Sequence, residues 1–176
     1  MEYLAGNAHS ALGQTDQAYQ RYQNAVTNYP LSYYSYLSLL ALVDAGVEVD
    51  ELNRGLVDYY SEQYDVALAA FDRYIAANPA DDGTAHYFRA QTLRAMQRYQ
   101  EAIDEYTAAI AINGKIADLH LSLGNNFRNQ QIYDQAVKEF TTANALNPGD
   151  PTPDLLISRT YATIGEFGKA RQYAKT

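Results

Sequence analysis

The chain has 176 residues, a formal net charge of -8 and no cysteine. These values exclude disulfide bonds, thiolate nucleophiles and cysteine-bound metals, and they argue against nucleic acid as a ligand, because phosphate binding needs clustered Lys and Arg. No apolar stretch is long enough to cross a bilayer, and the first residues lack the basic and apolar segments of a secretory signal, so the cellular compartment stays open.

The first predicted helix pair covers residues 1–30. Glycine, alanine, tyrosine and proline stand in it at places that recur further along the chain: Gly6, Gly13, Ala18, Tyr22, Ala25 and Pro30. A fixed recurrence of roughly 20–50 residues is typical of stacked helical units. We therefore expect this segment to be the first of several repeats.

Residues 32–46 predict one extra helix. The segment begins with Ser32, a preferred N-cap residue, ends at Gly46, and is apolar on nearly all sides. It lengthens the interval between the first two repeats, since Ala18 and Ala67 are 49 residues apart. We expect this inserted helix to be well buried.

Four further units follow, at about residues 48–80, 83–114, 117–148 and 151–176. Their second helices share an alanine, at Ala67, Ala102, Ala136 and Ala170, with intervals of 35, 34 and 34 residues. An aromatic residue stands three positions before each alanine and, in the first three units, another stands four positions after it. These spacings place all of them on one helix face, which we expect to be buried because alanine permits a close helix crossing.

The second helices are expected to end at Asn-Pro or Asn-Gly pairs. These pairs are Asn78-Pro79, Asn113-Gly114 and Asn147-Pro148. Proline ends a helix because it lacks an amide donor, whereas glycine does so because it tolerates left-handed backbone geometry.

Residues 117–148 carry the most complete pattern, with Leu123-Gly124, Phe127, Ala136, Phe140 and Pro148. This segment resembles the tetratricopeptide repeat, a helix hairpin with Leu-Gly, aromatic, Ala, aromatic and Pro at these places. The resemblance implies an all-α solenoid, a right-handed α-α superhelix of about five units with one inserted helix. About eleven helices would form a single domain over residues 1–176. It also implies a protein-protein interaction module that binds a peptide or protein partner in the concave groove lined by the first helices.

A second resemblance covers residues 31–95. The tyrosine-rich inserted helix at residues 32–46, followed by residues 54–60 and 67–75, resembles the helical N-terminal region of bacterial lytic transglycosylase-type proteins. This resemblance implies an alternative function, a non-catalytic helical scaffold within a larger cell-envelope enzyme. A self-assembling scaffold is a further alternative, because the last helix has no following helix to cover its apolar face. A homo-oligomer formed through this uncapped C-terminal helix belongs to that alternative.

No catalytic, cofactor or metal site is expected. His86 and His120 are 34 residues apart and occupy equivalent places in successive repeats, where a packing role is expected, and no histidine lies three or four residues from another. The adjacent acids Asp104 and Glu105 would point about 100° apart on a helix, which does not suit a general acid and base. We therefore predict a protein that is not an enzyme.

The 34-residue interval also places the candidate groove. Three stripes of residues are expected on the first helices: Tyr87, Leu121 and Leu155; Gln91, Asn125 and Arg159; Arg94 and Arg128. Arginine suits carboxylates because its planar fork makes two parallel hydrogen bonds, and asparagine can pair with a peptide backbone. We therefore expect a protein or peptide partner of acidic character. The alternative is that the arginines pair with neighbouring acids of the chain itself.

The charge is unevenly distributed. Residues 1–82 carry 3 basic and 12 acidic side chains, whereas residues 83–176 carry 10 and 9. A solvated surface that aids solubility explains this distribution, and so do two surfaces with different partners. The sequence leaves both interpretations open.

Overall fold

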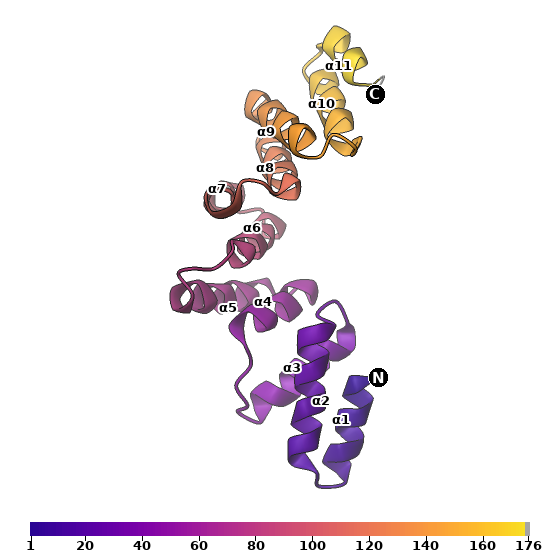
Figure 1. The fold of residues 1–176 in the computed structure, drawn as a ribbon, viewed down its shortest axis with the longest axis vertical. Helices are drawn as coiled ribbons and strands as arrows, with labels where there is room; N and C mark the ends of the chain where they lie inside the picture. Colours follow the sequence, from indigo (N-terminus) through magenta and orange to yellow (C-terminus); the bar gives the residue numbers. More distant parts are fainter. Residues whose placement is uncertain (175–176) are drawn as a thin grey trace. The chain divides into compact units, whose positions relative to one another are not determined.

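The structure is a computed structural model that describes residues 1–174, and within that range every regular element is a helix (Figure 1). The eleven helices are α1 (Glu2–Ala11), α2 (Thr15–Asn28), α3 (Tyr33–Asp44), α4 (Glu51–Tyr60), α5 (Tyr64–Ala77), α6 (Thr84–Ala95), α7 (Tyr99–Asn113), α8 (Ala117–Asn129), α9 (Tyr133–Leu146), α10 (Thr152–Thr163) and α11 (Phe167–Tyr173). The predicted all-α class and helix number are confirmed. Among the described residues, no helix combines the length and apolar character needed to cross a membrane.

The chain divides into two compact units, residues 1–80 and residues 81–176. In the first unit α1 packs on α2 and α4 on α5; in the second, α6 packs on α7, α8 on α9 and α10 on α11. Each pair is a hairpin closed by a short turn. Thr176, the predicted end of the last repeat, lies outside the described residues, and the assignment of the whole chain to one solenoid stays a prediction.

The hairpins depend on a close approach between a small residue of the first helix and an aromatic ring of the second. A Cβ atom added at Gly124 would lie 2.6 Å from the ring of Phe140, and one added at Gly55 would lie 2.5 Å from the ring of Phe71. Both rings are fully buried. Only glycine therefore lets α8 and α4 approach their partner helices this closely.

The face of the second helices that contains the shared alanine is buried in part. Ala67, Ala102 and Ala136 are inaccessible to solvent, as expected. The aromatic residues that precede these alanines, however, are only half-buried, and Phe167 is 65% exposed. Their burial was wrongly predicted because they lie in the first turn of each helix, at the edge of the crossing, where the partner helix covers one side only.

The inserted helix is α3, and its predicted N-cap is confirmed, since Ser32 Oγ accepts a hydrogen bond from the Tyr34 amide at 3.2 Å. Leu39 and Leu42 join the core formed by α2 and α4. The expectation that α3 is well buried is wrong, because Tyr33 on its outer face is 67% exposed. Neighbouring helices cover only one side of α3, so its apolar outer face stays in contact with solvent.

The hairpin turns use left-handed backbone geometry at one fixed place. The residues with positive φ there are Gly13, Glu62, Gln97, Gln131 and Gly165. The glycines adopt this geometry at no steric cost, whereas Glu and Gln do so against the clash of Cβ with the backbone. The expectation of left-handed geometry at Gly114 is wrong, because the φ angle of this residue is -74°. A Cβ at Gly114 would approach the Ile110 carbonyl to 3.1 Å, so close packing is the constraint there.

A buried carboxyl group lies inside the first unit. Asp58 on α4 is 4% exposed, and its Oδ2 lies 3.9 Å from Arg54 Nε. Neither atom has a hydrogen-bond partner among the described residues. Burial raises the pKa of Asp58 to about 6, opposed by the charges of Arg54 and Arg73 and assisted by that of Glu51. Burial therefore makes the Asp58 carboxyl easier to protonate than in water, and above about pH 6 the fold contains a buried charge.

We expect Gln131→Gly to stabilise the protein by about 0.5–1 kcal/mol, because glycine removes the steric cost of the positive φ. Urea unfolding followed by circular dichroism measures the free energy of unfolding. The matched control is Gln130→Gly, at a neighbouring residue with φ of -85°, which should destabilise. Equal effects of the two substitutions would contradict the role assigned to the left-handed turn.

We expect Asp58→Asn to stabilise the protein at pH 7.5 by about 1–2 kcal/mol, because the variant removes the cost of burying a charge. The gain in stability is partly offset, since Arg54 loses its ion-pair partner. A carboxyl whose pKa is raised on folding adds stability below its unfolded pKa and loses it as pH rises through about 6. The advantage of Asp58→Asn should therefore disappear near pH 4. Destabilisation of equal size at both pH values would show that the ion pair with Arg54 dominates.

Candidate interaction surface

All residues predicted to line the groove lie in the second unit, on the first helices of its three hairpins. Tyr87, Gln91 and Arg94 are on α6; Leu121, Asn125 and Arg128 are on α8; Leu155 and Arg159 are on α10. Gln91 Nε2 lies 3.5 Å from Ser122 Oγ, which brings the predicted faces of α6 and α8 together. We call the face formed by these residues the arginine face.

On α6 the predicted residues form a connected polar row. Gln91 Nε2 donates to the Tyr87 hydroxyl at 2.7 Å, and Arg94 Nε donates to Gln91 Oε1 at 3.0 Å. All three side chains are partly buried. The row holds the Arg94 guanidinium by its Nε, which leaves the two terminal nitrogens of the fork for another acceptor.

On α8 two of the predicted residues have local roles. Asn125 Nδ2 donates to the Leu121 carbonyl at 3.0 Å, so one donor of the amide is used within the helix. The Leu121 side chain packs against the core cluster around Phe140. Asn125 is thus less free to pair with a peptide backbone than the sequence suggested, whereas Leu155 on α10 is 54% exposed and available for contact.

Arg128 and Arg159 lie close enough for their charges to interact. Burial, and secondly the positive charge of Arg159, lower the pKa of Arg128 from its ordinary value. Neither guanidinium forms an ion pair with a carboxylate among the described residues. By contrast, Arg89 and Arg98 in the same unit pair with Glu105 and Glu101. The alternative that these groove arginines pair with neighbouring acids is therefore wrong for Arg128 and Arg159.

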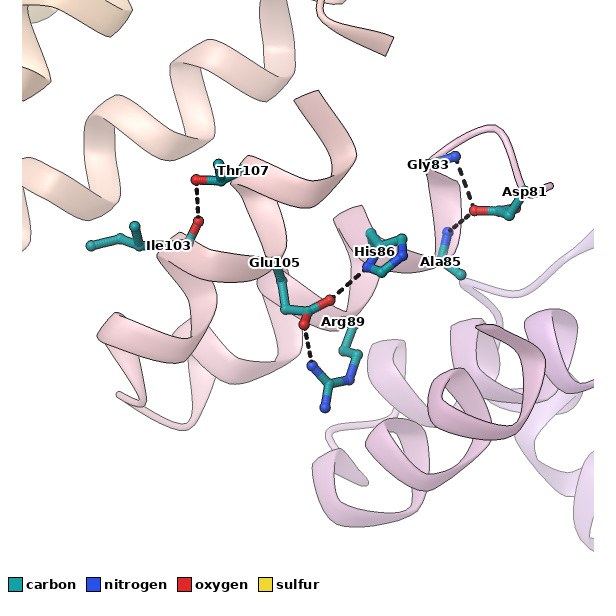
Figure 2. A network of polar contacts seen from close by, with 8 residues as sticks. All are labelled: Asp81, Gly83, Ala85, His86, Arg89, Ile103, Glu105 and Thr107. Carbon is teal, nitrogen blue, oxygen red and sulfur yellow. Dashed lines mark hydrogen bonds and ion pairs between the residues drawn. The ribbon is translucent and has the colours of Figure 1, made fainter. Parts of the chain in front are cut away.

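The two repeated histidines connect helices and do not gather a metal site. His86 Nδ1 lies 2.8 Å from Glu105 Oε2, and the other carboxylate oxygen accepts from Arg89 (Figure 2). His120 repeats the contact with Glu139 at 2.7 Å. The expected structural role is thus polar bridging between first and second helices. Within residues 1–174, no group of three or more His, Cys, Asp or Glu is arranged to hold a metal ion.

Comparison with known proteins places the sequence in a family. Tetratricopeptide-repeat family models match residues 52–115 and residues 2–32. The chain belongs to the tetratricopeptide repeat family. No curated protein sequence matches it significantly.

Several solved tetratricopeptide-type structures are similar to this chain. A crystal structure of MamA superposes with a TM-score of 0.66 at 20% identity, covering 97% of this chain and 90% of that one. YrrB, described as a tetratricopeptide protein with an unusual peptide-binding site, gives 0.62 at 18% identity, with 96% and 78% covered. The second tetratricopeptide domain of human RPAP3, solved with an HSP70 peptide, gives 0.59 at 25% identity, with 63% and 92% covered. The resemblance of residues 31–95 to transglycosylase-type proteins stays a prediction.

The stripes predicted for this tetratricopeptide array leave out Ser122. Its hydroxyl lies beside Gln91 and connects α8 to the row on α6. The signal was present, because Ser122 follows Phe88 by the same 34-residue interval. The residue type changes from phenylalanine to serine between these two repeats, so no common side-chain chemistry marks the place.

We expect Arg159→Gln to raise the melting temperature slightly at low ionic strength, because it relieves repulsion on Arg128. The gain should disappear in about 0.5 M NaCl, where salt screens the two charges. Thermal unfolding at both salt concentrations measures the effect. Arg98→Gln is the control, since it breaks a pair with Glu101 and should give no gain. A salt-independent change in Arg159→Gln would contradict the repulsion.

Proposed function

We propose that this protein is an interaction module whose arginine face binds a peptide or protein segment carrying carboxylates. The observation that carries the proposal is that Arg128 is partly buried within range of the Arg159 charge, while neither arginine forms an ion pair with a carboxylate among the described residues. Two like charges, one of them partly desolvated, lower stability unless an anion binds them. A carboxylate from a partner would accept two parallel hydrogen bonds from either fork.

The family and its relatives support a peptide or protein partner. YrrB is described as having a peptide-binding site, and the RPAP3 domain was solved with the HSP70 peptide SGPTIEEVD, which contains two glutamates and one aspartate. In the present chain, we assign the binding of the partner to three arginines, which lie on α6, α8 and α10. We propose that it works by binding and not by catalysis. The scaffold alternatives, within a cell-envelope enzyme or by self-association, stay predictions.

Selection from a random peptide library displayed on phage tests this proposal. Peptides that bind the wild-type chain should be enriched in Asp, Glu or a free carboxyl terminus. The double variant Arg128→Gln, Arg159→Gln should bind the selected peptides at least about 10- to 100-fold more weakly, since the loss of even one charged hydrogen bond costs about 1.5–3 kcal/mol. Isothermal titration calorimetry gives the dissociation constants.

The matched control removes the same charge elsewhere. Arg73 and Arg98 are exposed and already pair with Glu51 and Glu101, so Arg73→Gln, Arg98→Gln should leave affinity within about twofold. Circular dichroism verifies that both double variants are folded. Selected peptides without enrichment in acidic residues would contradict a carboxylate site on the arginine face. An equal loss of binding affinity in the two double variants would contradict it as well.

A further inference from the structure

A small cavity lies at the amino-terminal ends of α6 and α8. Its volume is about 190 Å³. Apolar and aromatic walls come from Tyr87, Phe88, Ile116 and Leu119, and polar groups come from Asp82, Thr84, Asn113 and Asp118. We call it the α6–α8 pocket. Tyr87 belongs both to this pocket and to the polar row of the arginine face, so the two features are continuous along α6.

The size and lining of the α6–α8 pocket suit one side chain. Cavities that hold whole cofactors or drug-sized molecules measure roughly 300–1,000 Å³, well above this volume. Aromatic and aliphatic walls favour an apolar occupant, because transfer of apolar surface out of water is favourable. An isolated leucine, isoleucine or methionine side chain of a bound peptide fits these conditions.

The rim of the α6–α8 pocket is acidic, opposite in sign to the arginine end of the face. A hydrogen bond from the Thr84 side chain lowers the pKa of Asp82, and so, secondly, does the hydrogen bond that the carboxylate accepts from the Thr84 amide at 3.0 Å. Asp118 lies in the first turn of α8 and is exposed. Two carboxylates at the rim favour a cationic residue beside the apolar one.

The pocket and Arg94 are a short peptide length apart. Thr84 at the pocket and Arg94 on the arginine face are ten residues apart on one helix, which corresponds to about 15 Å at 1.5 Å per residue. An extended peptide covers this distance with about four to five residues at 3.3 Å each. One linear segment can therefore occupy both places.

We propose that the α6–α8 pocket is an anchor site that selects bipolar peptides. Such a peptide places an apolar side chain in the pocket, a flanking Lys or Arg beside Asp82 and Asp118, and a carboxylate about four to five residues away at Arg94 of the arginine face. This inference rests on the proposed function, which supplies the carboxylate end. The opposite charges at the two ends fix the direction in which the peptide lies.

Synthetic peptides of graded length test the anchor site. The probes are acetyl-Lys-Leu-(Gly/Ser)n-Glu-amide with n from one to six, titrated into the ¹⁵N-labelled full chain and followed by NMR. Affinity should be highest at n of three or four, about tenfold above n of one. Replacing leucine by serine should weaken binding about tenfold. A series ending in glycine with a free carboxyl terminus distinguishes a terminal carboxylate from a side-chain carboxylate.

Two variants separate the pocket from general surface effects. Ile116 and Ile132 are exposed residues that immediately precede α8 and α9. Ile116→Ser should remove the preference for leucine, whereas Ile132→Ser should leave it intact. Asp118→Asn should abolish the preference for lysine over alanine at the flanking place.

The outcomes distinguish this inference from the proposed function. Binding that depends on glutamate and on Arg128 and Arg159, but not on leucine or on n, overturns the anchor site and leaves the carboxylate site standing. Binding that depends on leucine but is unchanged by glutamate or by the double arginine variant overturns the two-point peptide and the proposed function together. An equal loss of the preference for leucine in Ile116→Ser and Ile132→Ser also overturns the anchor site.

Discussion

The close crossing of the two helices in each hairpin is the constraint on which the rest of the structure depends. Where Gly124 faces Phe140 and Gly55 faces Phe71, an added methyl group would overlap a fully buried ring. A small residue against a large flat one lets the backbones approach and fills the space between them. The contact lies within one hairpin, so each repeat forms most of its core locally.

This local core leaves several side chains on the arginine face of the first helices without a role in packing. Within residues 81–174, that face carries Gln91, Arg94, Arg128 and Arg159, side chains that a closed core would exclude. The hairpins hold their backbones in place whatever these side chains contact. The hairpins can therefore tolerate the repulsion between Arg128 and Arg159, and the row of cations remains available to a partner.

Most of the fold could be predicted because the repeat appears as a regular spacing of residue types along the chain. The alanine intervals and the aromatic spacing place the second helices, and Ser32 places the start of α3. What could not be predicted depends on neighbours in space. The exposure of Tyr33 follows from helices covering α3 on one side only, and the close contact of Gly114 with Ile110 replaces a left-handed cap. Periodicity identifies a helix face but not how much of it another element covers.

The same limit applies to the arginine face, in a way that bears on function. The 34-residue spacing aligned Arg128 with Arg94 and Arg159 with Asn125. Only the structure shows that Arg128 is partly buried within range of the Arg159 charge. Only the structure shows, too, that Glu101 and Glu105 form ion pairs with other arginines. A sequence with nearly balanced charge in its second half would suggest that every cation has an anion. Glu101 and Glu105 already bind Arg98 and Arg89, and the carboxylate that we propose for a partner would relieve this repulsion directly.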